Sequence, residues 1–156
     1  MKRQVRSFIC AFRGLGQSFR EPHMRFHLVA CCYVLYFSLF YDFSKAEYSA
    51  LFVVMTLVFA AECVNTSIER LSDRVTQQWD EKIRMAKDLA AGAVLITALG
   101  ALAVGFVLFW DLTVFGEIAE YFGTNLTRWI PFLASLVVSG LFIAGKLFRR
   151  EESKDE

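Results

Sequence analysis

The chain alternates between long runs of uncharged, mostly apolar residues and short segments that hold most of the charges. About 20 apolar residues in a helix are needed to cross the hydrocarbon core of a bilayer. The apolar runs approach or reach that length, and 89–110 is the longest. The pattern predicts an all-α membrane protein with core spans at about 28–43, 48–70 and 89–110 and a fourth, C-terminal span at about 129–146.

The first 20 residues have a different pattern, in which apolar positions recur at helical spacing and basic residues occupy much of the remaining surface. This is typical of an amphipathic helix lying on a membrane face that carries anionic lipid; a helix packed on protein is the alternative. The apolar positions are Val5, Phe8, Ile9, Phe12, Leu15 and Phe19, and the basic positions are Lys2, Arg3, Arg6, Arg13 and Arg20.

Composition supports a polytopic membrane protein rather than a soluble core, with 56% hydrophobic residues, 16 Phe and a mean hydropathy of +0.41. We divide the chain into a core, 1–110, and a C-terminal segment, 111–156. That segment has a mixed linker with room for a short interfacial helix, the extra span and a charged cytoplasmic tail. The four cysteines lie in or beside apolar runs without metal spacing, so we interpret them as reduced packing residues.

The distribution of basic residues predicts the orientation in the membrane. Of the 17 Lys and Arg, only Lys45 and Arg128 fall outside the segments 1–27, 70–88 and 146–156. Basic residues flanking spans favour the cytoplasmic side, so these three segments are expected there. We expect a multi-pass membrane protein with these segments in the cytoplasm and with no nucleic-acid partner.

The most informative polar residues lie at the end of the second span. A helix turns about 100° per residue, so with Glu62 at zero, Asn65 falls at about −60°, Glu69 at about −20° and Asp73 at about +20°. A carboxylate inside an apolar segment is costly and is functional by default. Three aligned carboxylates and an amide suit a site that holds a divalent cation and abstracts a proton. The alternative is structural: a protonated Glu62 that makes one interhelical hydrogen bond.

Further acidic and basic residues on the predicted cytoplasmic side extend this site. Arg and Lys border a set of polar residues that consists of Glu21, Asp88 and the polar stripe, by which we mean Glu62, Asn65, Glu69 and Asp73. This combination suits magnesium-bridged phosphate chemistry beside lipid. Neither a GxxxxGK[ST] loop nor a GxGxxG loop is present, so a nucleotide site would have to be built from helices. A non-catalytic proton or cation relay is the rival of a different class.

Three motifs resemble those of the small bacterial membrane lipid kinases, the diacylglycerol kinase and undecaprenol kinase family. Residues 62–73 resemble its ExxNTxIExxxD motif, residues 86–95 its AKDxAAGAVL run, and Glu21 with 25–28 the start of its first span. The resemblance covers roughly 3–110 and leaves 111–156 unexplained. The loop reads Trp79-Asp80 where the family usually has Tyr-His, and His23 stands where undecaprenol-type members often have Asn.

The resemblance implies a role for each matching position. Glu62 would be the general base and Asn65 would orient the reacting groups beside it. Glu21 and Glu69 would bind Mg²⁺ together with the ATP phosphates. Nucleotide contacts would come from Arg3, Lys87 and Asp88, while Asp73 would keep the stripe in position.

The sequence therefore predicts ATP- and Mg²⁺-dependent phosphorylation of a membrane lipid alcohol on the cytoplasmic side. Undecaprenol is the first choice of acceptor because the hinge before the first span resembles the undecaprenol-type branch, and diacylglycerol is the alternative. The family also implies a location in the bacterial cytoplasmic (inner) membrane and a homotrimer whose active sites combine residues of neighbouring subunits.

Overall fold

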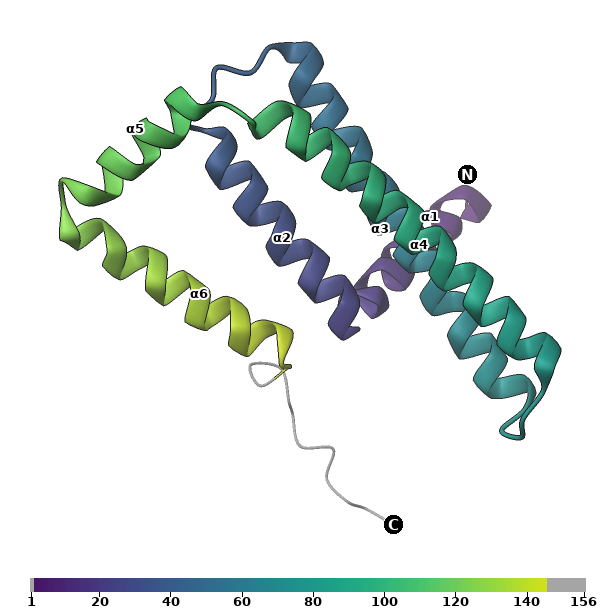
Figure 1. Ribbon diagram of the computed structural model, residues 1–156. Coiled ribbons are helices and arrows are strands. Elements are labelled where there is room, and N and C mark those ends of the chain that lie inside the picture. Colours follow the sequence, from purple (N-terminus) through teal and green to yellow (C-terminus); the bar gives the residue numbers. More distant parts are fainter. Residues whose placement is uncertain (1, 146–156) are drawn as a thin grey trace. The chain divides into compact units, whose positions relative to one another are not determined.

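The computed structural model describes the backbone of residues 2–145 and the side chains of residues 4–145, and this part of the chain is helical without a strand (Figure 1). The predicted all-α class is confirmed. The elements are α1 (Lys2–Ser18), α2 (Pro22–Ser38), α3 (Lys45–Val75), α4 (Glu81–Phe109), α5 (Leu112–Gly123), the short 3₁₀ helix η1 (Leu126–Arg128) and α6 (Trp129–Ile143).

Three helical segments are long and apolar enough to cross a membrane: α3, α4 and Leu126–Ile143, which combines η1 with α6. The predicted span at 28–43 corresponds to α2, which begins earlier, because Pro22 starts the helix, and has 17 residues. That length is at the lower limit for a span. The mixed linker contains α5, and the end of the fourth predicted span at 146 lies outside the described residues.

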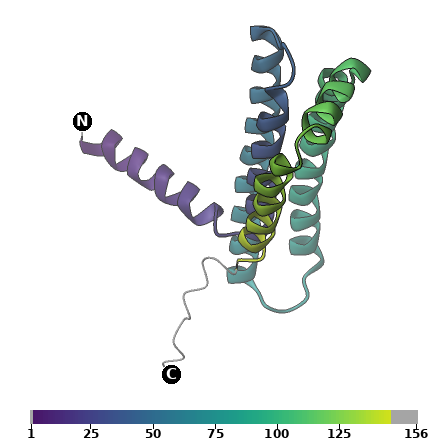
Figure 2. The ribbon, with the colours of Figure 1, turned by 90° about the vertical axis from the view of Figure 1, so that its left-hand side faces the viewer.

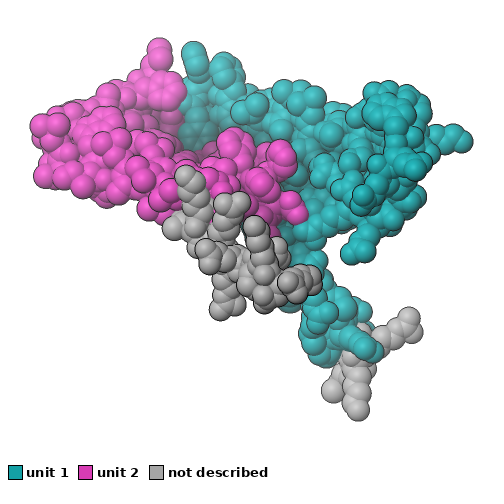
Figure 3. All heavy atoms as spheres, turned by 90° about the horizontal axis from the view of Figure 1, so that it is seen from below, with its two compact units in different colours: residues 1–19, 42–110 teal, residues 20–41, 111–156 magenta. Residues whose placement is uncertain are grey.

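The chain forms two compact units, which are coloured separately in Figure 3. The first comprises residues 1–19 and 42–110, with α1, α3 and α4, and the second comprises residues 20–41 and 111–156, with α2, α5, η1 and α6. The domain boundary predicted at residue 110 stays a prediction.

In the first unit, α3 and α4 form an antiparallel hairpin. Phe43 contacts Phe109 edge to face at 5.2 Å near one end of the hairpin, and Asp73 pairs with Lys87 near the other. Helix α3 begins with a capping box in which the Ser44 amide donates to Glu47 Oε2 at 2.7 Å and the Glu47 amide donates to Ser44 Oγ at 3.3 Å. These bonds satisfy two amides that a helix start otherwise leaves unpaired.

Helix α1 extends away from this hairpin (Figure 2) and contacts α3 near its own C-terminal end, where Arg70 donates to Gln17 at 3.5 Å. The apolar side chains Phe8, Ile9 and Phe12 are exposed and are not covered by the rest of the unit. A helix with a bare apolar face and a basic opposite face fits the predicted membrane-surface position.

In the second unit, α2 and α6 run antiparallel and are joined by hydroxyl and aromatic contacts. The Tyr33 hydroxyl lies 3.0 Å from Ser135 Oγ, and the Phe37 ring meets Phe132 at 6.2 Å. Beyond these contacts Phe40 meets Tyr121 of α5 at 5.2 Å. The C-terminal segment is thus packed on the helix that the family resemblance assigns to the first core span.

Candidate functional site

The polar stripe of α3 lies on the same side of the helix as the buried apolar residues that precede it. With Glu62 at zero, Leu51 and Val58 fall at about −20° and −40°, so they share the side of the helix that carries the carboxylates. Both are buried, as are Glu62, which is 5% exposed, and Asn65, which is 8% exposed. Glu69, one turn further, is half-buried. The first two polar residues of the stripe are therefore shielded from solvent in the folded chain.

The central residues of the stripe contact one another directly. The Asn65 side-chain amide donates from Nδ2 to Glu69 Oε1 at 3.1 Å, as the spacing of four residues allows. The other amide atom, Asn65 Oδ1, is buried and has no hydrogen-bond partner within the described part of the chain. A buried polar atom without a partner is costly, and such atoms mark places where a ligand, ion or water is expected.

An ion pair joins the end of the stripe to α4. Lys87 donates from Nζ to Asp73 Oδ1 at 3.1 Å, and the Asp73 side chain is 70% exposed. At that exposure the pair contributes at most about 1 kcal/mol to stability, because water screens it. The pair matters more for position than for stability: it holds the Lys87 ammonium near the end of the stripe that is predicted to face the cytoplasm.

A cavity of about 550 Å³ lies where the α3–α4 turn meets these residues. We call it the turn cavity. It offers two cations, Lys87 and Arg84, and hydroxyl, amide and carboxylate groups from the turn. Its lining consists of Ser72, Asp73, Thr76, Gln77, Gln78, Trp79, Asp80, Ile83, Arg84, Lys87 and Asp88.

The departure from the family pattern at Trp79-Asp80 has a structural explanation. Asp80 is the N-cap of α4 and accepts from the amides of Lys82 and Ile83 at 2.9 and 3.1 Å. The Arg84 guanidinium lies 5.3 Å from the centre of the exposed Trp79 ring. Both positions line the turn cavity, but the carboxylate of Asp80 is engaged by its own helix.

Sequence reasoning missed Arg84 as a site residue. Arg84 lies three residues before Lys87 and therefore on the same face of α4. Arg84 also pairs with Glu81 at 2.7 Å. Helical spacing from the predicted Lys87 was the signal that could have identified it.

The predicted site residues divide into groups. The structure brings Glu62, Asn65 and Glu69 together on α3, and Asp73, Lys87 and Asp88 around the turn cavity. Glu21 belongs to the second unit, where it is the half-buried N-cap of α2. The side chain of Arg3 lies outside the described residues. The roles assigned to all these residues stay predictions.

The donor chemistry of the stripe suits Mg²⁺, although no group of three or more His, Cys, Asp or Glu within the described residues is arranged to hold a metal ion. Mg²⁺ takes oxygen ligands and usually keeps one or two protein carboxylates, its remaining positions being filled by phosphate and water. Glu69 and the unpartnered Asn65 Oδ1 are ligands of this type. A sparse protein ligand set therefore fits an ion that arrives with a nucleotide.

Comparison with known proteins identifies the class first. The chain is 33% identical over 110 residues to the undecaprenol kinase of Bacillus subtilis, covering 70% of this chain and 89% of that protein. It is 32% identical over 101 residues to a diacylglycerol kinase of Synechocystis sp., covering 64% of this chain and 58% of that protein, and 32% identical over 107 residues to a diacylglycerol kinase of Sinorhizobium sp., covering 65% and 78%. The protein is a multi-pass membrane lipid kinase.

The family follows from a more specific match. The chain belongs to the family described as prokaryotic diacylglycerol kinase, whose profile matches residues 9–109. No solved structure matches the chain. Membership in a kinase family accounts for the acidic stripe better than a non-catalytic relay does, and the match ends where α4 ends.

Proposed function

We propose that this lipid kinase transfers the γ-phosphate of ATP, with Mg²⁺, to the hydroxyl of undecaprenol. The observation that carries the proposal is that one helical hairpin, formed by α3 and α4, holds both an acid that can accept the proton and cations that can bind the phosphates. The buried acid and amide of Glu62 and Asn65 lie on α3, and the cations Arg84 and Lys87 face the turn cavity.

The chemistry follows from the positions of these groups. The acceptor hydroxyl oxygen attacks the γ-phosphorus, its proton passes to the Glu62 carboxylate, and the bond from the γ-phosphorus to the leaving oxygen of ADP breaks. Glu62 later returns the proton to water. Asn65, buried beside Glu62, orients the reacting groups, and Lys87 with Arg84 stabilises the charge on the phosphates.

Magnesium would be held by oxygen ligands in this proposal. Bound Mg²⁺ neutralises phosphate charge and aligns the transferring group. Glu69 and Asn65 Oδ1 are the candidate ligands on α3, and Glu21 is the second carboxylate that the family resemblance implies. The Asn65–Glu69 hydrogen bond would keep the glutamate oxygen on the same side of the helix as the amide oxygen.

The identity of the lipid acceptor is the most specific part of the proposal. Undecaprenol is supported by the relative from Bacillus subtilis, of which this chain covers 89%, and by the hinge residues Arg25, His27 and Leu28. Diacylglycerol remains the second candidate because two relatives carry that name.

A competition assay tests the acceptor and the base together. Purified protein receives ATP labelled at the γ-phosphate and vesicles containing equal amounts of undecaprenol and diacylglycerol. We expect label mainly in undecaprenyl phosphate, loss of label when Mg²⁺ is chelated, and a fall of at least about a hundredfold for Glu62→Gln.

Glu117→Gln is the matched control, because it makes the same change at an exposed position on α5. Label mainly in phosphatidic acid would establish the diacylglycerol alternative. Equal labelling by Glu62→Gln and wild type would remove Glu62 as the base, and label in neither lipid would contradict both acceptors.

We further propose a homotrimer in the cytoplasmic membrane with its active sites on the cytoplasmic side. The basic residues concentrate in segments that share one predicted side. The most apolar window of α4 has no residue buried within this chain, so lipid or other copies of the chain must cover it.

A further inference from the structure

The strongest unexplained feature of the second unit is the buried guanidinium of Arg25, which is 8% exposed. Nη2 donates to the Arg20 carbonyl at 2.9 Å, and Nε makes a long contact of 3.5 Å with the Glu21 carbonyl. Nη1 donates to the Phe142 carbonyl of α6 at 2.9 Å. One side chain thus joins the hinge before α2 to the last turn of α6.

This contact adds a charged donor at the C-terminal end of α6, where the Phe142 carbonyl also accepts from the Gly145 amide at 3.1 Å. The last carbonyls of a helix lack partners within the helix and carry partial negative charge, so a cation there is favourable. Helix α6 has no basic residue in its own last turn. Arg25 supplies that charge from α2, and its planar fork can reach carbonyls on two elements at once, which the single ammonium of a lysine cannot do as well.

The chain next to this contact favours glycine by its backbone conformation, and a side chain there would displace the Arg25 guanidinium. Gly145 has φ +71°, a conformation that side chains other than glycine rarely adopt. A Cβ at this position would also lie 2.7 Å from Arg25 Nη1, closer than such atoms approach. The backbone after α6 is therefore shaped to admit the guanidinium.

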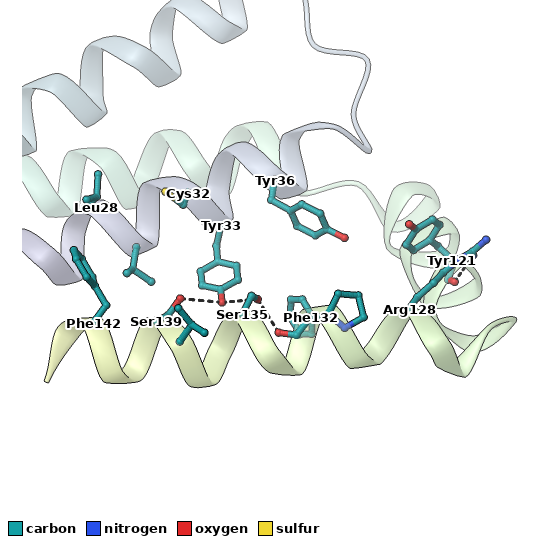
Figure 4. A pocket seen from close by; sticks show the side chains of 13 residues that line it. Leu28, Cys32, Tyr33, Tyr36, Tyr121, Arg128, Phe132, Ser135, Ser139 and Phe142 are labelled. Carbon is teal, nitrogen blue, oxygen red and sulfur yellow. Dashed lines mark hydrogen bonds between the residues drawn. The ribbon is translucent and has the colours of Figure 1, made fainter. Parts of the chain in front are cut away.

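A second attachment fixes the position of α6 along α2. The Tyr33 hydroxyl points between two serines of α6, 3.0 Å from Ser135 Oγ and 3.3 Å from Ser139 Oγ (Figure 4). Tyr33 and Arg25 are about 12 Å apart along α2, as the helical rise gives. Two polar attachments at that separation oppose both sliding and rotation of α6.

We infer that α6 is a positioning element for Glu21, acting through Arg25. This inference rests on the proposed function, in which Glu21 binds the Mg²⁺ of the nucleotide. Glu21 is the N-cap of α2, yet its side chain makes no capping hydrogen bond. Its backbone carbonyl and that of Arg20 are held by Arg25, which α6 anchors in turn. Catalytic and binding groups act efficiently only when the backbone that carries them is fixed.

The test compares two glycine substitutions in the full-length protein. Gly145→Ala introduces a Cβ against Arg25, whereas Gly140→Ala is the control because a Cβ there meets nothing within 4 Å. For Gly145→Ala we expect the KM for MgATP to rise about five- to tenfold, with the KM for the lipid unchanged. Amide hydrogen exchange of residues 20–25 should become faster, and Gly140→Ala should change neither quantity by more than about twofold.

Arg25→Lys and Tyr33→Phe keep the test decisive if Gly145→Ala does not fold. Arg25→Lys keeps the charge but loses the fork and should reproduce the high KM for MgATP. Tyr33→Phe removes only the second attachment and should accelerate exchange at the hinge with a smaller rise in KM. Wild-type KM and wild-type hinge exchange in the folded variants would overturn the inference.

Glu21→Gln separates this inference from the proposed function. If Glu21→Gln is as active as wild type at low Mg²⁺, the assignment of Glu21 as a metal ligand is wrong, whatever α6 does. If Glu21→Gln is inactive while Gly145→Ala and Arg25→Lys behave as wild type, only the positioning by α6 is wrong.

Discussion

At the scale of single residues, burial divides the stripe of α3 into two parts with different chemistry. Glu62 and Asn65 are shielded, which suits proton transfer without competition from water, whereas Asp73 is open and paired with Lys87. Helical spacing was enough to predict that these residues share a face. It could not predict that Asn65 uses one amide atom on Glu69 and leaves the other unpartnered, because that depends on side-chain rotamers and on the burial of Asn65 in the folded chain.

Lys87 is the residue whose proposed role can be tested most directly. Lys87→Met keeps the length of the side chain and removes its charge, so the KM for ATP should rise about tenfold through loss of a charged hydrogen bond. Lys82→Met is the matched control, because Lys82 is exposed on the same helix and does not line the turn cavity. Initial rates measured against ATP concentration give KM and kcat for each variant. Equal effects of the two substitutions would place the phosphates elsewhere.

At the scale of elements, the hydrophobic blocks predicted the helices better than their ends. The ends depend on local groups that a hydrophobic pattern does not report, such as Pro22 at the start of α2 and the Asp80 cap of α4. Helix α4 begins eight residues before its predicted span because a charged first turn can be helical outside the membrane. Contacts between α2 and α6 were not predictable, since apolar faces of spanning helices are chemically alike.

Asp80 should matter for the stability of α4. Asp80→Ala removes the acceptor of two amide hydrogen bonds and should lower the free energy of unfolding by about 1 kcal/mol. Asp80→Asn retains a capping oxygen and should stay close to wild type. Thermal unfolding in detergent measures both variants. If Asp80→Asn instead raises the KM for ATP strongly at unchanged stability, the carboxylate contacts the nucleotide rather than only its own helix.

At the scale of the whole molecule, residues proposed to act together are distributed over two units of one chain. The acid stripe and the turn cavity belong to the unit with α3 and α4, and Glu21 belongs to the unit with α2 and α6. The family resemblance implied that active sites combine residues of neighbouring subunits. Sequence motifs identify such residues but do not tell which copy of the chain supplies each one.

Mixed assemblies test this arrangement. Glu21→Gln and Glu62→Gln should each be inactive alone, because each removes one proposed site residue. If sites are shared between copies, co-expressing both variants should restore part of the wild-type rate, since some sites then receive neither substitution. Mixing the two proteins after separate purification is the control, because mixed assemblies then form only if subunits exchange. Absence of any recovery on co-expression would contradict sharing of these two residues.

The guanidinium contact between α2 and the last turn of α6 implies a thermodynamic reciprocity. If docking of α6 favours nucleotide binding at the hinge, nucleotide binding must favour docking of α6 by the same coupling free energy. The hydrogen bond between Arg25 and the Phe142 carbonyl would then become more stable when nucleotide is bound, although Phe142 does not contact the nucleotide in the proposed site. Docking of α6, which lies outside the family match, would in this way depend on whether nucleotide is bound.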